Sequence, residues 1–117
     1  MMKSGIQFER GEIILVPFPF TDISKSKLRP VLIISHTSYN KTSSDFICCG
    51  ITSNLNNKNN SVLLSNVDMK DGTIQKKSRI KFANVFTLQK DLAIKRIGQI
   101  NSKKLNIVIS SITNLIS

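Results

Sequence analysis

The sequence predicts a mainly β fold, a small and strongly bent sheet or barrel, that ends in one α-helix. Short apolar runs rich in Ile, Leu and Val recur along the chain, and turn-forming residues bound each of them, which is the pattern of strands. From residue 103 the apolar spacing changes to that of an amphipathic helix. The 117 residues are predicted to form one domain over 1–117, with 1–10 as an N-terminal extension.

The first two predicted strands lie in the stretch GEIILVPFPFTDISKSKLRPVLIIS. Its apolar runs at 11–18 and 30–35 contain many β-branched residues, which favour strands. Pro17 and Pro19 lack the N–H that a sheet ladder uses, so the first strand should fray at its C-terminal end. An exposed loop over 20–28 follows, and such loops often carry binding residues.

Further apolar runs predict strands at 46–52, 62–64, 78–88 and 93–100. The polar stretch SNLNNKNN connects the first two of these, and Asp71-Gly72 predicts a turn. The C-terminal helix is predicted over 102–116, with Asn101 or Ser102 as its cap.

Two adjacent cysteines, Cys48 and Cys49, lie within one predicted strand. Neighbouring residues of a strand point to opposite faces, so the two thiols are expected to be reduced, one in the core and one on the surface. Nothing near them has the spacing of zinc ligands. We therefore expect neither a metal nor a cofactor.

The charge of the chain is strongly positive, with 17 Lys and Arg residues against 7 Asp and Glu residues and a formal net charge of +10. Such a balance predicts a polyanionic partner or an acidic protein partner. The plain alternative is a genome biased towards Lys, Asn and Ile codons, but that bias leaves the scarcity of acids unexplained. The N-terminus has no signal-peptide pattern and no window is long enough to span a bilayer, so a soluble, cytoplasmic protein without a membrane partner is expected.

The order of motifs along the chain resembles one protein family. The Arg-Pro pair that opens the second predicted strand, the ITS at 51–53, the SRIKFANVFTL at 78–88 and the KRIGQI at 95–100 are similar to the MazF/PemK toxins of bacterial type II toxin–antitoxin systems. The resemblance runs from about residue 11 to the last helix. Arg-Pro combined with the later Thr-Ser is specific, whereas either alone is weak.

This resemblance implies an SH3-like barrel, usually a homodimer, that acts as a metal-independent endoribonuclease on single-stranded RNA and is neutralised by a cognate antitoxin. It also implies two catalytic residues, since the arginine before the conserved proline is Arg29 and the threonine after the third strand is Thr52. The gyrase-poisoning CcdB toxins share the fold, which keeps a toxin that acts by protein contact as an alternative.

The chemistry of RNA cleavage gives these two residues independent roles. RNA is cut without metal or water when its own 2′-hydroxyl attacks the adjacent phosphorus, a route closed to DNA. The guanidinium of Arg29 offers paired donors that match two phosphate oxygens and stays charged, whereas a lysine offers a point charge. Thr52 would hydrogen-bond the scissile phosphate or orient the 2′-hydroxyl, with Ser53 as a helper. On spacing alone, a solvated arginine and a strand-end hydroxyl are the simpler interpretations.

Further RNA contacts are expected from Lys25 and Lys27 in the loop, from the ring of Phe20 as a stacking face, and from the amide of Asn84. Each has an ordinary alternative: a solvated charge, a core phenylalanine or an edge-strand asparagine. A general base is not visible. The single histidine, His36, is expected to cap the second strand or to face solvent.

Two alternatives and two partner interactions complete the expectations. The alternatives are a gyrase-directed toxin and a catalytically silent module that binds nucleic acid or antitoxin. A cationic groove that holds RNA also suits an acidic, disordered antitoxin tail, which would inhibit by covering the RNA path. The apolar stripe of the C-terminal helix is expected either to form a homodimer contact or to pack on the sheet of its own chain.

Overall fold

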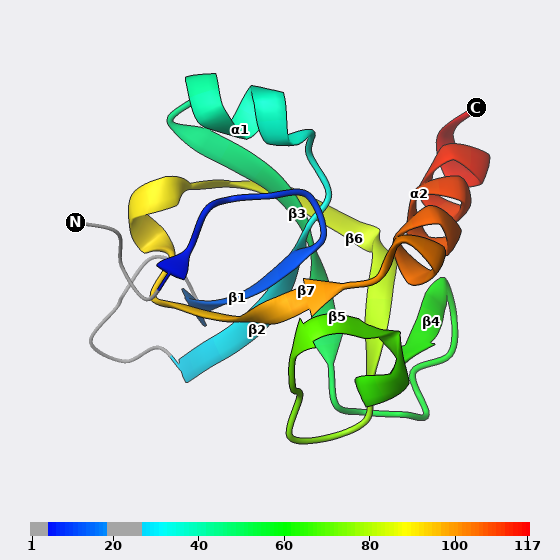
Figure 1. Ribbon diagram of the computed structural model, residues 1–117. Coiled ribbons are helices and arrows are strands. Elements are labelled where there is room, and N and C mark those ends of the chain that lie inside the picture. Colours follow the sequence, from blue (N-terminus) through cyan, green and yellow to red (C-terminus); the bar gives the residue numbers. More distant parts are fainter. Residues whose placement is uncertain (1–4, 19–26) are drawn as a thin grey trace.

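The computed structural model describes residues 5–18 and 27–117, and its main feature is one curled antiparallel sheet (Figure 1). In the described part the sheet has seven strands in the order β4-β6-β3-β2-β1-β7-β5, and it forms a half-barrel. The strands are β1 (Glu12–Phe18), β2 (Lys27–Ile33), β3 (Asp45–Thr52), β4 (Ser61–Leu64), β5 (Met69–Gly72), β6 (Ser78–Gln89) and β7 (Lys95–Ile100). The helices are α1 (Thr37–Thr42) and α2 (Ser102–Ile116), with short 3-10 turns η3 (Asn66–Asp68) and η4 (Lys90–Leu92).

Both faces of the sheet are buried, because alternate residues of the central strands enter two different apolar clusters. Ile14, Val31 and Cys48 lie on one face, which Ile6 of the N-terminal segment covers; we call this the N-terminal face. The other cluster lies on the face that α2 covers, which we call the helix face. It contains Ile13, Leu32, Cys49, Ile80 and Val108. Strands buried on both sides explain why their sequences read as continuous apolar runs.

The C-terminal helix confirms the predicted bounds and cap. The side chain of Asn101 accepts a hydrogen bond from the backbone N–H of Lys104, and α2 starts at the next residue, Ser102. Of the predicted apolar stripe, Val108 is fully buried against the sheet, while Leu115 is 47% and Ile116 is 81% exposed. The apolar stripe therefore packs on the chain's own sheet only in part. No helix in the described part is long and apolar enough to cross a membrane.

Two local predictions were wrong, and one short helix was not predicted. Asp71 and Gly72 lie in β5, where Gly72 has φ +75° and a Cβ would come 2.2 Å from the carbonyl oxygen of Ile97. The strand has only four residues, two of them charged, and ends in a glycine at a close backbone approach, so it looks like a turn in sequence. The helix α1 and the start of β2 at Lys27, inside the predicted loop, were also missed.

The predicted surface thiol is the remaining correction. Cys48 and Cys49 do point to opposite faces, as the alternation requires, but both are 0% exposed because both faces are covered. Burial raises the pKa of the Cys49 thiol to about 12 and raises that of Cys48 as well. Both thiols are thus protonated and unreactive core groups at neutral pH.

Candidate active site

The sheet register brings Arg29 and Thr52 to the same level of neighbouring strands. Strand β2 pairs with β3 at Val31↔Gly50, Leu32↔Cys49 and Ile33↔Cys48, so the same register carried two residues further sets Arg29 opposite Thr52. Strand alternation gives both side chains the N-terminal face, because they lie two residues from Val31 and Gly50 respectively. The continued register therefore assigns two residues that the sequence singled out separately to the same level and the same face of neighbouring strands.

Proline explains why the paired ladder stops just before this point. Pro30 has no N–H to donate, and the β2–β3 pairing begins only at Val31. On its other side Arg29 is paired with Val16 of β1, so its backbone position is still fixed. The Arg-Pro pair thus holds a guanidinium at a place where two strands stop exchanging hydrogen bonds.

The two side chains differ in what holds them. Arg29 is exposed, and its guanidinium has no hydrogen bond or ion pair with any residue in 5–18 or 27–117. Thr52 is partly buried, and its Oγ1 accepts a hydrogen bond of 3.1 Å from the backbone N–H of Asn54. A hydroxyl that accepts one bond in this way still has its own hydrogen to donate. The site therefore presents a charged fork beside an oriented hydroxyl.

Strand β6 adds two cations to the same face. Arg79 is the register partner of Thr52, and Lys81 is the partner of Gly50. Neither was predicted as a site residue from the sequence. They are two residues apart, and they pair with Gly50 and Thr52, which are also two residues apart. This spacing is the signal that would have identified them, but it can be recognised only once the register is known.

Asn84, which was predicted as an RNA contact, lies close to this group. The register between β3 and β6 shifts between Cys49 and Gly50, so that β6 has extra residues there. A Cβ built on Gly50 would come 2.9 Å from Nδ2 of Asn84. The exposed amide of Asn84 therefore covers the backbone of β3 two residues before Thr52.

The loop between β3 and β4 is fastened to these two β6 cations. Nε of Arg79 donates to the carbonyl oxygen of Leu55 (2.9 Å), and Nη1 donates to Oγ of Ser61 (3.2 Å). Nζ of Lys81 donates to Oδ1 of Asn57 (2.7 Å). Since both cations share the face of Thr52, the loop forms one wall beside the Arg29–Thr52 pair.

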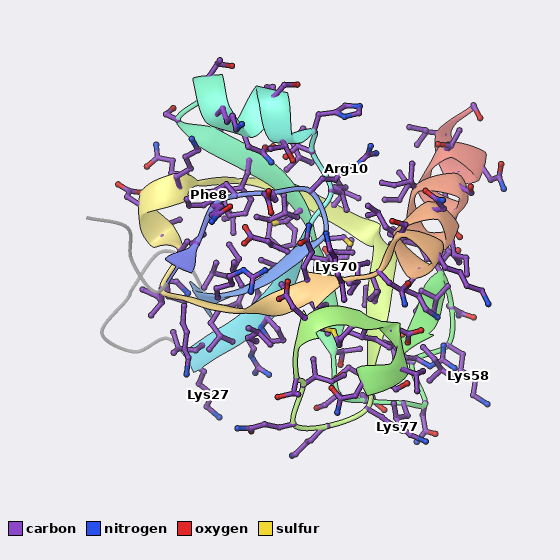
Figure 2. The ribbon with its side chains drawn as sticks, in the orientation of Figure 1. Phe8, Arg10, Lys27, Lys58, Lys70 and Lys77 are labelled. Atoms are coloured by element: carbon purple, nitrogen blue, oxygen red, sulfur yellow. The ribbon has the colours of Figure 1, made fainter. Side chains whose placement is uncertain are left out.

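The charge around this wall is of one sign. Figure 2 shows Lys27, Lys58 and Lys77 along the lower side of the molecule, with Arg10 towards the top. The segments 27–44, 46–67 and 72–90, which supply β2, the β3–β4 loop and β6, contain no Asp or Glu. We call this end of the sheet the cationic end; its members are Lys27, Arg29, Lys58, Lys77, Arg79 and Lys81.

Ser53 lies elsewhere. It lines a cavity of about 620 Å³ together with Leu28, Pro30, Ile51 and Ser78, all of which alternate onto the helix face. The structure therefore does not bring Ser53 together with Thr52: β3 ends at Thr52, and the next residue, Ser53, faces the cavity on the helix face. Lys27 is exposed and two residues from Arg29 on the same strand.

The remaining predicted residues do not add to the site. Phe20 and Lys25 lie outside the described residues. His36 is exposed at the N-terminal end of α1 and its side chain makes no capping bond, which confirms that it faces solvent. In the described part of the chain, no three His, Cys, Asp or Glu side chains lie together as metal ligands.

Solved structures with the same fold include a toxin and complexes with an antitoxin. A MazE–MazF complex from Deinococcus radiodurans matches with a TM-score of 0.75 and 17% identity, over 92% of this chain and 94% of that one. The Mycobacterium tuberculosis toxin MazF-mt6 matches with a TM-score of 0.70 and 17% identity, over 88% and 93%. An endoribonuclease in complex with its cognate antitoxin, from a mycobacterial species, has a TM-score of 0.69 and 16% identity, over 91% and 89%.

At these identities the structures establish the fold alone, and family membership comes from the sequence pattern. No curated protein matches the chain in sequence. The family model of PemK-like, MazF-like toxins of type II toxin–antitoxin systems matches residues 9–116, which is nearly the whole chain and includes both Arg29 and Thr52. The chain therefore belongs to the PemK-like, MazF-like toxins of type II toxin–antitoxin systems.

Proposed function

We propose that this protein is the toxin of its system and acts as a metal-independent, sequence-specific endoribonuclease on single-stranded RNA. The proposal is supported by the exposure of Arg29, a guanidinium without an acidic partner in the described part, and by the register of β2 and β3, which, continued two residues past Val31, puts Thr52 at the same level. Endoribonucleases and MazF toxins with the same fold, some in complex with antitoxins, support it.

The proposed reaction is an internal transesterification of the RNA. The 2′-oxygen attacks the adjacent phosphorus and loses its proton, a 2′,3′-cyclic phosphate forms, and the bond from phosphorus to the 5′-oxygen breaks. The leaving 5′-oxygen takes up a proton and becomes a 5′-hydroxyl. No water and no oxidant is consumed overall, because the proton lost by the 2′-oxygen balances the proton taken up by the 5′-oxygen. Besides these proton transfers, the reaction requires that the phosphate is held and that the charge developing on its oxygens is stabilised.

Arg29 and Thr52 divide this task. The guanidinium donates two parallel hydrogen bonds to the non-bridging phosphate oxygens, which carry more charge in the transition state than in the substrate. The Thr52 hydroxyl, which accepts one hydrogen bond from the N–H of Asn54, donates its own hydrogen to the scissile phosphate or aligns the 2′-hydroxyl. Lys27 and Lys81 follow the backbone of the RNA on either side, and Asn84 offers its amide to a base.

The cationic end also suits an inhibitor. An acidic antitoxin tail would pair with the same lysines and arginines that hold RNA, and so block the path of the substrate. We further propose a homodimer in the cytoplasm, with the half-exposed stripe of α2 at the contact, where Leu115 and Ile116 are left uncovered.

Incubation of the purified protein with a long single-stranded RNA and with its DNA analogue, both in EDTA, tests the proposal. RNA-only cleavage with 2′,3′-cyclic phosphate and 5′-hydroxyl ends, absent in Arg29→Ala, is expected. Intact RNA, or cleavage that Arg29→Ala retains, would count against it. In that case inhibition of DNA gyrase becomes the next activity to assay, since a toxin that works by protein contact does not need this pair.

A further inference from the structure

Arg79 is the register partner of Thr52 on the neighbouring strand, but its side chain bonds to the β3–β4 loop and not to Thr52. Its guanidinium bridges the two ends of the β3–β4 loop, because Nε donates to Leu55 at the start of the loop and Nη1 donates to Ser61 at its end. The side chain is partly buried. Two of its donors are therefore committed to the protein, unlike those of Arg29.

A short series of hydrogen bonds leads from this bridge back to Thr52. The backbone N–H of Asn54 donates to Thr52 Oγ1 (3.1 Å), and Oδ1 of Asn54 accepts from the N–H of Asn56 (3.1 Å). Leu55, whose carbonyl oxygen Arg79 holds, lies between these two residues. Any drift of the loop at Leu55 therefore moves the N–H that orients the Thr52 hydroxyl.

The loop has few other attachments to keep it in place. Residues 53–56 are exposed, and the loop is rich in Asn, which folds it by local side-chain bonds and not by an apolar core. Lys81 adds a second attachment at Asn57, but a lysine has one flexible point of contact. The planar fork of Arg79 can fix two acceptors at a set distance, which is what closing a loop requires.

We infer that Arg79 is a positioning residue: it holds the β3–β4 loop so that the Thr52 hydroxyl keeps the orientation needed for RNA cleavage. The inference rests on the proposed function and deepens it. Its consequence is that Arg79 contributes to turnover through Thr52, and not through a phosphate contact of its own.

Arg79→Gln should lower kcat about tenfold and leave KM within about twofold, since displacement of a catalytic group by a fraction of an ångström has effects of this order. The kcat of Arg79→Lys should fall almost as far, because lysine keeps the charge but lacks the paired donors of the guanidinium. Arg10→Gln is the matched control: Arg10 is also partly buried, and its Nε also donates to a backbone carbonyl, that of Ile34 at 3.0 Å, well away from the cationic end in Figure 2.

A double-mutant cycle distinguishes this role from a general structural one. In a Thr52→Ala background, Arg79→Gln should reduce the remaining activity by less than twofold, because the group that it positions is already gone. A full tenfold loss in that background would overturn the inference, as would Arg79→Lys with wild-type kcat, which would indicate a charge contact. If Arg79→Gln folds poorly, Ser61→Ala removes one acceptor of the fork and should give a smaller loss in the same direction.

Amide hydrogen exchange in the free protein gives a measurement that needs no activity. Exchange at Asn54 and Asn57 should be severalfold faster in Arg79→Gln than in wild type, while Leu32 in the centre of the sheet is unchanged. Unaltered exchange in an otherwise active Arg79→Gln overturns the inference alone. Wild-type protein that leaves RNA intact contradicts the proposed function instead, and with it the catalytic part of this inference.

Discussion

Arg29 and Arg96 lie on strands that both pair with β1, yet their surroundings are opposite. Nε of Arg96 is 2.6 Å from Oε2 of Glu12, while its Nη1 and Nη2 lie 2.7 and 3.1 Å from the two carboxylate oxygens of Asp71. Arg29 is exposed and has no acidic partner in the described part. One guanidinium is neutralised by its own chain, and the other remains available to an external anion.

The difference between Arg29 and Arg96 shows which cations of this chain have carboxylate partners. The Asp71 and Glu12 carboxylates raise the pKa of Arg96, and Arg96 in turn lowers the pKa of Asp71, so each group stabilises the charge of the other. Lys104 lies 3.6 Å from Asp68, close to the same side of the sheet. Glu12, Asp68 and Asp71 thus each lie beside a cation of the fold, and no Asp or Glu lies in the segments that form the cationic end.

The largest effect is expected at Arg96, the arginine that is paired with acids of its own chain. Arg96→Met leaves the Glu12 carboxylate, whose side chain is 1% exposed, without its cation, and this should lower the free energy of unfolding by about 3 kcal/mol or more. Urea denaturation measures it. Adding Glu12→Gln should restore much of the loss, because no buried charge then remains. A single variant as stable as wild type would contradict the structural role given to Arg96.

The next effect concerns the unpaired side. Arg29→Ala should reduce kcat by on the order of a hundredfold, while the free energy of unfolding changes by less than about 0.5 kcal/mol. Arg29→Lys, which keeps the charge but not the fork, should recover only part of the activity. A clear drop in stability together with activity would show that Arg29, like Arg96, serves the fold.

Acid should weaken the paired side by a smaller amount. The bond from Arg96 lowers the pKa of Asp71 below its ordinary value of 3.8. The stabilisation is therefore complete above about pH 3.8 and is lost as the pH falls through the lower folded pKa. Because the Asp71 side chain is 47% exposed, we expect at most about 1 kcal/mol. Asp71→Asn should flatten unfolding free energy against pH in this range, and an unchanged profile would argue against the pair.

The smallest effect distinguishes two exposed lysines. Lys27→Gln should weaken binding of a non-cleavable RNA by about two- to threefold. It should also reduce the slope of log binding constant against log salt concentration by about 0.7, the value for one phosphate contact on a single strand. Lys70, which lies next to Asp71 outside the cationic end, is the control (Figure 2). Titrations by fluorescence anisotropy at several salt concentrations measure both, and equal losses would mean that only net charge matters.

Local patterns predicted much of the fold, because apolar periodicity and capping are encoded within a few residues. The strands around Ile14, Cys48 and Leu88 and the helix capped by Asn101 are of this kind. The strand at Asp71-Gly72 was missed, since it depends on a close approach to Ile97 that lies far along the chain. Long-range pairing is the information that a single sequence does not display.

The candidate site shows the same division. Arg29 and Thr52 were named from the order of motifs and from phosphate chemistry, and the register of β2 and β3, continued two residues past Val31, puts them at the same level. Arg79 and Lys81 were missed, because a basic residue in a strand looks like a solvated charge until its cross-strand neighbour is known. Ser53 was grouped with Thr52 because the two are adjacent in sequence, although β3 ends at Thr52 and Ser53 lines the cavity on the helix face.

The most direct measurement uses a substrate in which only one 2′-hydroxyl is present. Once a cleavage site has been mapped on a long RNA, the same sequence is made as DNA with a single ribonucleotide before the scissile phosphate, and again with a 2′-O-methyl group there. Cleavage of the first, with a 2′,3′-cyclic phosphate end, and none of the second are expected if the RNA supplies its own nucleophile. Cleavage of the 2′-O-methyl substrate, or a 5′-phosphate end, would contradict the role assigned to Arg29 and Thr52.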